Sequence, residues 1–230
     1  MRRALGALAI AILSLGAGRA VMGGWAVITV EHLPESLVVG QPATIAFTVR
    51  QHGKTPLSDR SPTVALKKDG AGWLTRGERT RATLTDTPGR YETTLTPEDT
   101  GAVRITIDAD FYGARVTLLP VPVVPAGTSP ASATVTDRGR ALFVAKGCFT
   151  CHVKRDDPDL RDYESLNFAP ELTGRGFAPD WIAAKLADPA KNRIRFNDWL
   201  EMPNLGLDRE EIAALARYVN ARAGEIAAKR

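Results

Sequence analysis

The sequence predicts two domains, an all-β sandwich followed by a small all-α domain, which are joined by a proline-rich linker. Three observations predict this organisation. Residues 24–124 alternate between apolar and polar side chains with a period of two, which is typical of half-buried strands. Residues 137–230 carry helix signals instead, and residues 125–136 between them are rich in Pro, Ser, Thr and Ala. A chain of 230 residues is long enough to bury a core in each domain.

The first twenty residues have the pattern of a secretory signal peptide. Two arginines precede an apolar run over residues 4–18, and small residues surround a cleavage site that we expect after Ala20. The run is shorter than the roughly 20 residues that a spanning helix needs, and an uncleaved anchor is the alternative. The net charge is +3 for residues 1–20, 0 for residues 21–127 and +1 for residues 128–230. The basic charge therefore indicates export to the periplasm and no nucleic-acid partner, with membrane association only through the N-terminus.

The strands of the first domain are marked by alternating runs and intervening turns. Residues 43–49 place Ala, Ile, Phe and Val on one face, and residues 103–107 place Val, Ile and Ile on another. Turn clusters rich in Gly and Pro separate about seven short strands. This number favours a sandwich of immunoglobulin-like size, without an inter-sheet disulfide because the domain has no cysteine.

Three helices are expected in the second domain. The first lies within residues 137–147, where Asp137 precedes the apolar positions and a glycine ends them. The second lies within residues 179–189, which have a proline at each end. Asp208 and Glu211 form a capping-box pattern for the last helix, which should end near Gly224.

Both cysteines of the chain lie in one motif, Cys148-Phe149-Thr150-Cys151-His152. C-x-x-C-H is the attachment motif of c-type haem, because two thiols at this spacing can each add to a vinyl group and the next imidazole can reach the iron. Other interpretations are weaker. A zinc site lacks a second ligand pair, a redox pair lacks a βαβ context, and a disulfide here would close a tiny loop. The motif therefore predicts one covalently attached haem c.

Met202 is the expected second axial ligand of the iron. The other histidines, His32 and His52, belong to the first domain, and Met22 is the other thioether beyond the signal peptide. Met202 follows His152 by fifty residues and precedes a proline and the last helix. Ligation by His and Met raises the potential of haem iron and suits electron transfer. The alternative is an ordinary core methionine.

Residues 138–225 resemble a class I cytochrome c domain. Gly139-x-x-Leu142-Phe143 is similar to the first helix of the family, whose glycine and aromatic residue pack on the last helix. Residues 169–174, Ala-Pro-Glu-Leu-Thr-Gly, are similar to the loop after the haem, and Met202-Pro203 to the distal ligand loop. Residues 212–219 are similar to the terminal helix.

The resemblance implies further site residues. In the family the loop proline's carbonyl accepts a hydrogen bond from the axial histidine, which assigns this role to Pro170. The 18 residues that separate the motif histidine from this proline are more than in the compact mitochondrial type. Arg175 and Trp199 are implied as contacts of the haem propionates, with a solvated arginine and a packed indole as the alternatives. Tyr163 and Phe168 are expected to cover the haem or to belong to the core.

The first domain resembles the small YtkA-like sandwich family of exported bacterial proteins. The similarity rests on Gly24-Trp25-Ala26-Val27, on residues 47–53 and on Pro88-Gly89-Arg90-Tyr91. It implies no settled chemistry, and a docking or binding role is expected. The alternative is a metal-handling domain in which His32, His52 and Met22 bind copper.

The sequence as a whole predicts an exported monohaem cytochrome c that carries single electrons between periplasmic or membrane respiratory partners. A haem enzyme such as a peroxidase would need an open position on the iron, and Met202 argues against one. A redox sensor, or a subunit that handles haem and copper, is the further alternative.

Overall fold

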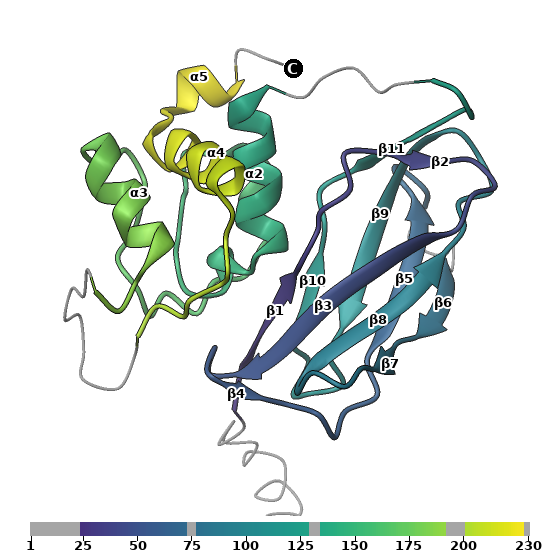
Figure 1. Ribbon diagram of the computed structural model, residues 1–230. Coiled ribbons are helices and arrows are strands. Elements are labelled where there is room, and N and C mark those ends of the chain that lie inside the picture. The colour runs from purple at the N-terminus through teal and green to yellow at the C-terminus, as the bar shows by residue number, and fades with distance from the viewer. Residues whose placement is uncertain (1–23, 73–76, 129–133, 192–200, 228–230) are drawn as a thin grey trace, which may run out of the picture.

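The computed structural model describes residues 24–72, 77–128, 134–191 and 201–227. Strands occupy the N-terminal part and helices the C-terminal part (Figure 1). The strands are β1 (Ala26–Val30), β2 (Leu37–Val38), β3 (Ala43–Gln51), β4 (Thr55–Pro56), β5 (Thr63–Lys68), β6 (Glu78–Arg81), β7 (Thr83–Leu84), β8 (Arg90–Leu95), β9 (Gly101–Asp108), β10 (Arg115–Thr117) and β11 (Val121–Val124). The helices are α2 (Val135–Ala145), α3 (Pro179–Ala187), α4 (Arg209–Asn220), α5 (Ala223–Ala227), and the 3₁₀ turns η1 (Cys148–Thr150) and η2 (Pro158–Leu160).

The strands form two sheets that pack as a sandwich. One sheet has the order β1-β3-β8-β7, with β4 on β3, and the other has the order β2-β11-β9-β5-β6, with β10 on β9. Among the described residues seven strands have at least four residues, which agrees with the expected number, and the other four are shorter. The described pairings are antiparallel except that of β2 with β11.

The alternating runs supply the core between the sheets. In β9 Val103, Ile105 and Ile107 are buried and the polar residues beside them are partly exposed, as the period of two predicts. In β3 the buried set includes Ile45, Phe47 and Val49, and the ring of Phe47 stacks on Tyr91 of β8 at 5.9 Å. Thr48 departs from the alternation, since it is buried as well. Each large apolar side chain that leaves water contributes roughly 1.5–3 kcal/mol.

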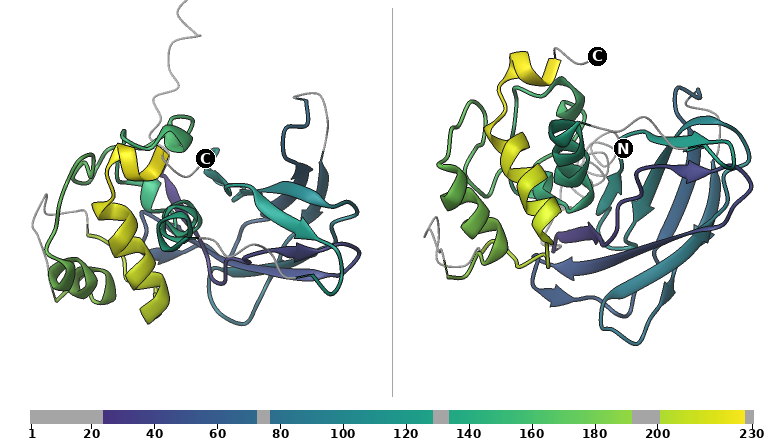
Figure 2. Two further views of the ribbon diagram at one scale, coloured as in Figure 1. Left: turned by 90° about the horizontal axis from the view of Figure 1, so that it is seen from above. Right: turned by 45° about the horizontal axis from the view of Figure 1, so that its top comes forward.

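Strand β1 is buried along its whole length although it lies at the edge of its sheet. An edge strand would leave its outer side open, and here the helical part of the chain covers it. The views in Figure 2 place α2 between α4 and the sandwich. The amine of Lys146 donates to the carbonyl of Glu31 at 2.6 Å, and Arg138 donates to the carbonyl of Leu33 at 3.0 Å. The buried apolar residues of both parts form a single cluster.

Helices α2 and α4 cross at a glycine. A Cβ atom on Gly139 would lie 2.0 Å from the carbonyl oxygen of Ala214, so no other residue permits this approach. Beside the crossing the rings of Phe143 and Tyr218 lie 5.5 Å apart. This is the packing of glycine and aromatic residue on the last helix that the resemblance implies.

The start of α2 differs from the prediction. The helix begins at Val135, two residues before Asp137, and the side chain of Thr134 caps it by accepting from the Asp137 N–H at 3.1 Å. Thr and Asp are both favourable N-caps, and the earlier one is used here. The expected linker, residues 125–136, therefore ends inside the helix; residues 129–133 of it lie outside the described residues.

The other helices begin as predicted. Helix α3 starts at a proline and ends before the next one, and Asp208 and Glu211 form the reciprocal capping box of α4. Helix α4 ends at Asn220, earlier than expected, because Ala221 is extended and Gly224 lies in the separate helix α5. No helix in the described ranges is long and apolar enough to cross a membrane.

Candidate functional site

The cysteine motif forms a tight turn at the end of α2. Residues 148–150 make one 3₁₀ turn, and the carbonyl of Cys148 accepts from the N–H groups of Cys151 at 3.2 Å and His152 at 3.0 Å. These bonds bring both sulfur atoms and the imidazole onto one turn of backbone. The cysteines are free thiols and do not form a disulfide with each other.

Gly147 makes this turn possible. It has a φ of +74°, a conformation that L side chains rarely adopt, and it ends α2. A Cβ atom there would lie 2.7 Å from both the carbonyl oxygen of Ile28 and the Cγ1 of Val27. The glycine therefore lets β1 lie directly against the residue that precedes Cys148.

His152 is oriented by one hydrogen bond. Its Nδ1 lies 2.8 Å from the carbonyl oxygen of Pro170, the contact that the resemblance implies. A carbonyl only accepts, so Nδ1 carries the proton and Nε2 keeps its lone pair. Burial lowers the pKa of His152, and the nearby charge of Lys185 lowers it further, against the opposing effect of the bond to Pro170. The ring is thus neutral at pH 7 and has one nitrogen available for a metal.

Hydrogen bonds between backbone groups hold the loop that follows the cysteine motif against the turn of residues 148–152. The N–H of Leu166 donates to the carbonyl of Thr150 at 2.9 Å, and the N–H of Ala169 to that of Cys151 at 3.1 Å. These hydrogen bonds fold the loop back on the turn, so that Pro170 lies beside His152 although 18 residues separate them in the sequence. A cavity of about 450 Å³ lies between His152 and this loop.

Both thiols are protonated at neutral pH. Burial, with a smaller effect of Cys151, raises the pKa of Cys148 to about 12, and burial raises the pKa of Cys151 to about 11. Addition of an S–H group across a vinyl double bond gives a thioether and needs no oxidant. The donor set of two thiols, a neutral imidazole and a thioether therefore fits covalently attached haem.

The other predicted site residues are placed as follows. Met202 is partly buried against the apolar cluster, in the coil that leads into α4. Arg175 is exposed, and its Nε donates to the carbonyl of Glu171 at 3.3 Å. Tyr163 and Phe168 lie against the sandwich, where Tyr163 donates to the carbonyl of Thr117 at 2.6 Å. Trp199 lies outside the described residues.

A buried ionic group behind the motif was not predicted. Lys154 is 4% exposed, and its amine caps the end of α4 by donating to the carbonyl of Ala221 at 2.9 Å, beside Asp156 at 3.1 Å. Tyr218 donates to the fully buried carboxylate of Asp157 at 2.7 Å, and burial raises the pKa of this tyrosine. Charged residues in a loop usually face solvent, so the amino-acid composition of this loop does not predict that Lys154 and Asp157 are buried.

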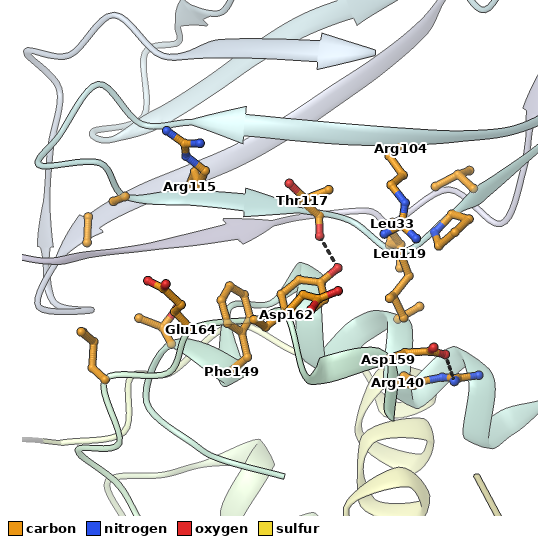
Figure 3. Close-up of a pocket in the computed structure, with 18 of the residues that line it drawn as sticks. Leu33, Arg104, Arg115, Thr117, Leu119, Arg140, Phe149, Asp159, Asp162 and Glu164 are labelled. Atoms are coloured by element: carbon orange, nitrogen blue, oxygen red, sulfur yellow. Dashed lines mark hydrogen bonds and ion pairs between the residues drawn. The ribbon is translucent and has the colours of Figure 1, made fainter. Parts of the chain in front are cut away.

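A groove of about 1240 Å³ runs between the sandwich and the helices beside the motif (Figure 3). Phe149, which stands between the two cysteines, lines it together with Thr150. Side chains of both charges face the groove, among them Arg104, Arg115, Arg140, Asp159, Asp162 and Glu164. The groove is therefore lined by apolar side chains together with charges of both signs, and it carries no strong net charge.

The residues considered for copper do not gather at one place. His32 and His52 are both exposed, and the ring of His52 lies 5.4 Å from that of Trp25. Met22 lies outside the described residues. Within the ranges that the structure covers, no three His, Cys, Asp or Glu side chains are grouped to hold a metal ion.

Comparison with known proteins identifies the helical part. The family model for cytochrome c matches residues 136–222, a stretch that contains the cysteine motif, Pro170 and Met202. These residues form a cytochrome c domain, and its cofactor is covalently attached haem c. The match supports a haem-containing electron-transfer protein. No curated protein matches the chain.

Solved structures resemble the chain over somewhat less than half of its length. The filamin domain of Lin-41 has 14% identity and a TM-score of 0.32 over 43% of this chain and 91% of that one. A CARDB domain from Pyrococcus furiosus, in complex with di-metal ions, has 18% identity and a TM-score of 0.30 over 45% and 90%. A superoxide reductase (neelaredoxin) from Ignicoccus hospitalis has 16% identity and a TM-score of 0.31 over 46% and 88%.

Proposed function

We propose that this protein is an exported class I monohaem cytochrome c that passes single electrons between redox partner proteins in the periplasm or at the membrane. The observation that supports it most is the arrangement at His152, which directly follows the second of two free thiols. Its Nδ1 is held by the Pro170 carbonyl, and its Nε2 stays available. An imidazole fixed in this tautomer is what an axial ligand of haem iron requires.

Each residue has a distinct part in this proposal. Cys148 and Cys151 attach the haem through thioether bonds, and His152 and Met202 are the axial ligands. The bound haem supplies reversible one-electron chemistry. Pro170 keeps the imidazole in one orientation and makes it a better donor. Arg175 and Trp199 are proposed as contacts of the propionates.

The N-terminal part is proposed to be an immunoglobulin-type sandwich, similar to the YtkA-like family, with a docking or binding role. The signal-peptide pattern of residues 1–20 supports export, and redox proteins of a respiratory chain are the proposed partners. No nucleic-acid partner is proposed, since almost all of the excess positive charge lies in those twenty residues.

The test is purification of the exported protein, followed by intact mass and optical spectra. We expect the added mass of one haem, the loss of about twenty residues, and a near-infrared band from the sulfur–iron bond in the oxidised form. Met202→Ala should keep the haem attached, lose that band and give high-spin or water-ligated iron. A wild-type spectrum without the band, together with turnover of hydrogen peroxide, would favour a haem enzyme over an electron carrier.

A further inference from the structure

The two chain segments that carry the axial ligands touch the same narrow part of the sandwich. This part, called the edge strip below, consists of residues 25–27 at the start of β1 and residues 52–54 in the turn after β3. Trp25 and His52 join its two halves, through a hydrogen bond from the His52 N–H to the Trp25 carbonyl at 2.9 Å and through their rings at 5.4 Å. The strip is therefore a single surface.

On the motif side the strip packs against residues next to the cysteines. The Cγ1 of Val27 lies 2.7 Å from the position that a Cβ atom on Gly147 would take, so strand and turn are in tight contact. The ring of Trp25 lies 5.7 Å from that of Phe168. Phe168 immediately precedes Ala169, whose N–H is bonded to the carbonyl of Cys151.

On the methionine side the strip meets both neighbours of Met202. A Cβ atom on Gly53 would lie 3.3 Å from the Cγ of Pro203 and 3.6 Å from the Cγ2 of Val27. The amine of Lys54 lies 3.3 Å from the carboxylate of Glu201, and both side chains are partly exposed. The coil on either side of Met202 is thus held by a packed contact and by an ion pair.

We propose that the edge strip positions Met202 relative to His152, so that the sandwich itself helps to keep the methionine sulfur on the iron. This inference rests on the proposed function. Residues 201–208 form no helix or strand, whereas β1 and β3 pair along five residues. A coil segment opens at a lower free energy than a paired sheet. Contacts between this coil and the sheet therefore raise the free energy that is needed to separate the Met202 sulfur from the iron. Gly53 and Lys54 are positioning residues in this arrangement.

The first test adds a methyl group between the strip and Pro203. Gly53→Ala places it 3.3 Å from the Cγ of Pro203, and we expect the coil to move rather than the buried strand residue Val27. Gly40→Ala is the matched control, because Gly40 has a φ of +70° against +71° for Gly53 and nothing lies within 4 Å of its added Cβ. Both variants carry the same backbone strain, and only one touches the methionine coil.

The measurement is the affinity of cyanide for the oxidised holoprotein, since cyanide binds the iron only after the methionine leaves. We expect Gly53→Ala to bind cyanide about fivefold more tightly than Gly40→Ala, equivalent to about 1 kcal/mol, and to have a weaker near-infrared band. Equal affinities and equal bands in the two variants would overturn the proposal.

The second test reverses the ion pair. Lys54→Glu and Glu201→Lys should each increase the cyanide affinity about threefold at low salt, and the double variant should return it toward that of the wild type. Lys68→Glu makes the same charge change on an exposed lysine of β5 and should have no effect. The increase should shrink in about 1 M salt, where surface charges are screened. Failure of the double variant to restore the affinity would overturn the role of Lys54.

The outcome separates this inference from the proposed function. A wild-type protein without the near-infrared band lacks methionine ligation, and then the proposed function fails. A wild-type protein with the band, whose strip variants all match their controls, keeps the proposed function and loses the role of the strip.

Discussion

Lys146 gives the sharpest test of how the sandwich is attached, and we expect Lys146→Met to destabilise the protein strongly. The residue is 2% exposed, and its amine lies 2.6 Å from the carboxylate of Glu211 at the start of α4. The same amine donates to the carbonyl of Glu31 just after β1, and the Lys146 carbonyl is 3.5 Å from the hydroxyl of Thr29. One side chain therefore connects the sandwich, α2 and α4.

The expected loss of unfolding free energy follows from the buried groups that lose their partner in Lys146→Met. Methionine fills similar space, but the buried carboxylate of Glu211 loses its cation and the carbonyl of Glu31 loses its donor. Removal of one partner of a buried ion pair costs about 3–5 kcal/mol. The double variant Lys146→Met with Glu211→Gln removes the unpaired charge and keeps the side-chain acceptor of the capping box, so it should cost only about 1–2 kcal/mol.

The assay is urea unfolding of the holoprotein, followed by far-ultraviolet circular dichroism and by haem absorbance. We expect the two signals to change together in the wild type, since both parts share one apolar cluster. In Lys146→Met the midpoint should fall, and in the double variant much of the loss should be recovered. A loss below about 1 kcal/mol in the single variant, or no recovery in the double one, would refute the reasoning about a buried pair.

Two further predictions concern packing and pH. Gly139→Ala should lower the free energy of unfolding, measured with denaturant, by at least about 1–3 kcal/mol. Its Cβ would lie 2.0 Å from the Ala214 carbonyl oxygen, and this overpacking outweighs the gain in helix propensity. An unchanged unfolding midpoint would contradict the helix crossing. Burial raises the pKa of Tyr163 to about 12 from its usual 10.0, so its contribution to stability is present below pH 10 and is lost as the pH rises through about 12. Tyr163→Phe should therefore flatten the fall in the free energy of unfolding over that window, and a slope equal to that of the wild type would show that the phenol ionises freely.

The sequence predicted best the features that depend on neighbouring residues. The turn of Cys148 to His152 follows from one local motif, and α3 is bounded by two prolines whose backbone chemistry permits little else. The capping box of Asp208 and Glu211 likewise needs only four consecutive residues. Pro170 came from a family resemblance, because nothing in its local pattern indicates that its carbonyl faces an imidazole 18 residues away.

The features that the sequence did not predict depend on contacts between distant residues. In the sequence Lys146 and Lys154 have the pattern of ordinary surface charges. They are buried because the end of β1 packs against Lys146 and the end of α4 packs against Lys154. Strand β1 shows no alternation of exposure because the helical part covers its outer side. The alternation of apolar and polar residues along a strand does not predict such cover by a distant part of the chain. At the start of α2 both Thr134 and Asp137 are good caps, and local propensity does not choose between them.

We expect the surface between the two parts, and not the linker, to set their relative position. The sequence suggested a semi-rigid proline-rich spacer, yet three features of the structure cross the contact. They are the hydrogen bond from Lys146 to the Glu31 carbonyl, a shared apolar cluster and the hydrogen bond from Tyr163 to the Thr117 carbonyl. Doubling the length of a flexible connection costs only about 0.6 kcal/mol of closure entropy. Insertion of a Gly/Ser segment after Thr128 that doubles the linker should therefore lower the unfolding free energy by less than about 1 kcal/mol, far less than Lys146→Met does. If the insertion were as damaging as that substitution, the linker and not the packed surface would hold the sandwich in place.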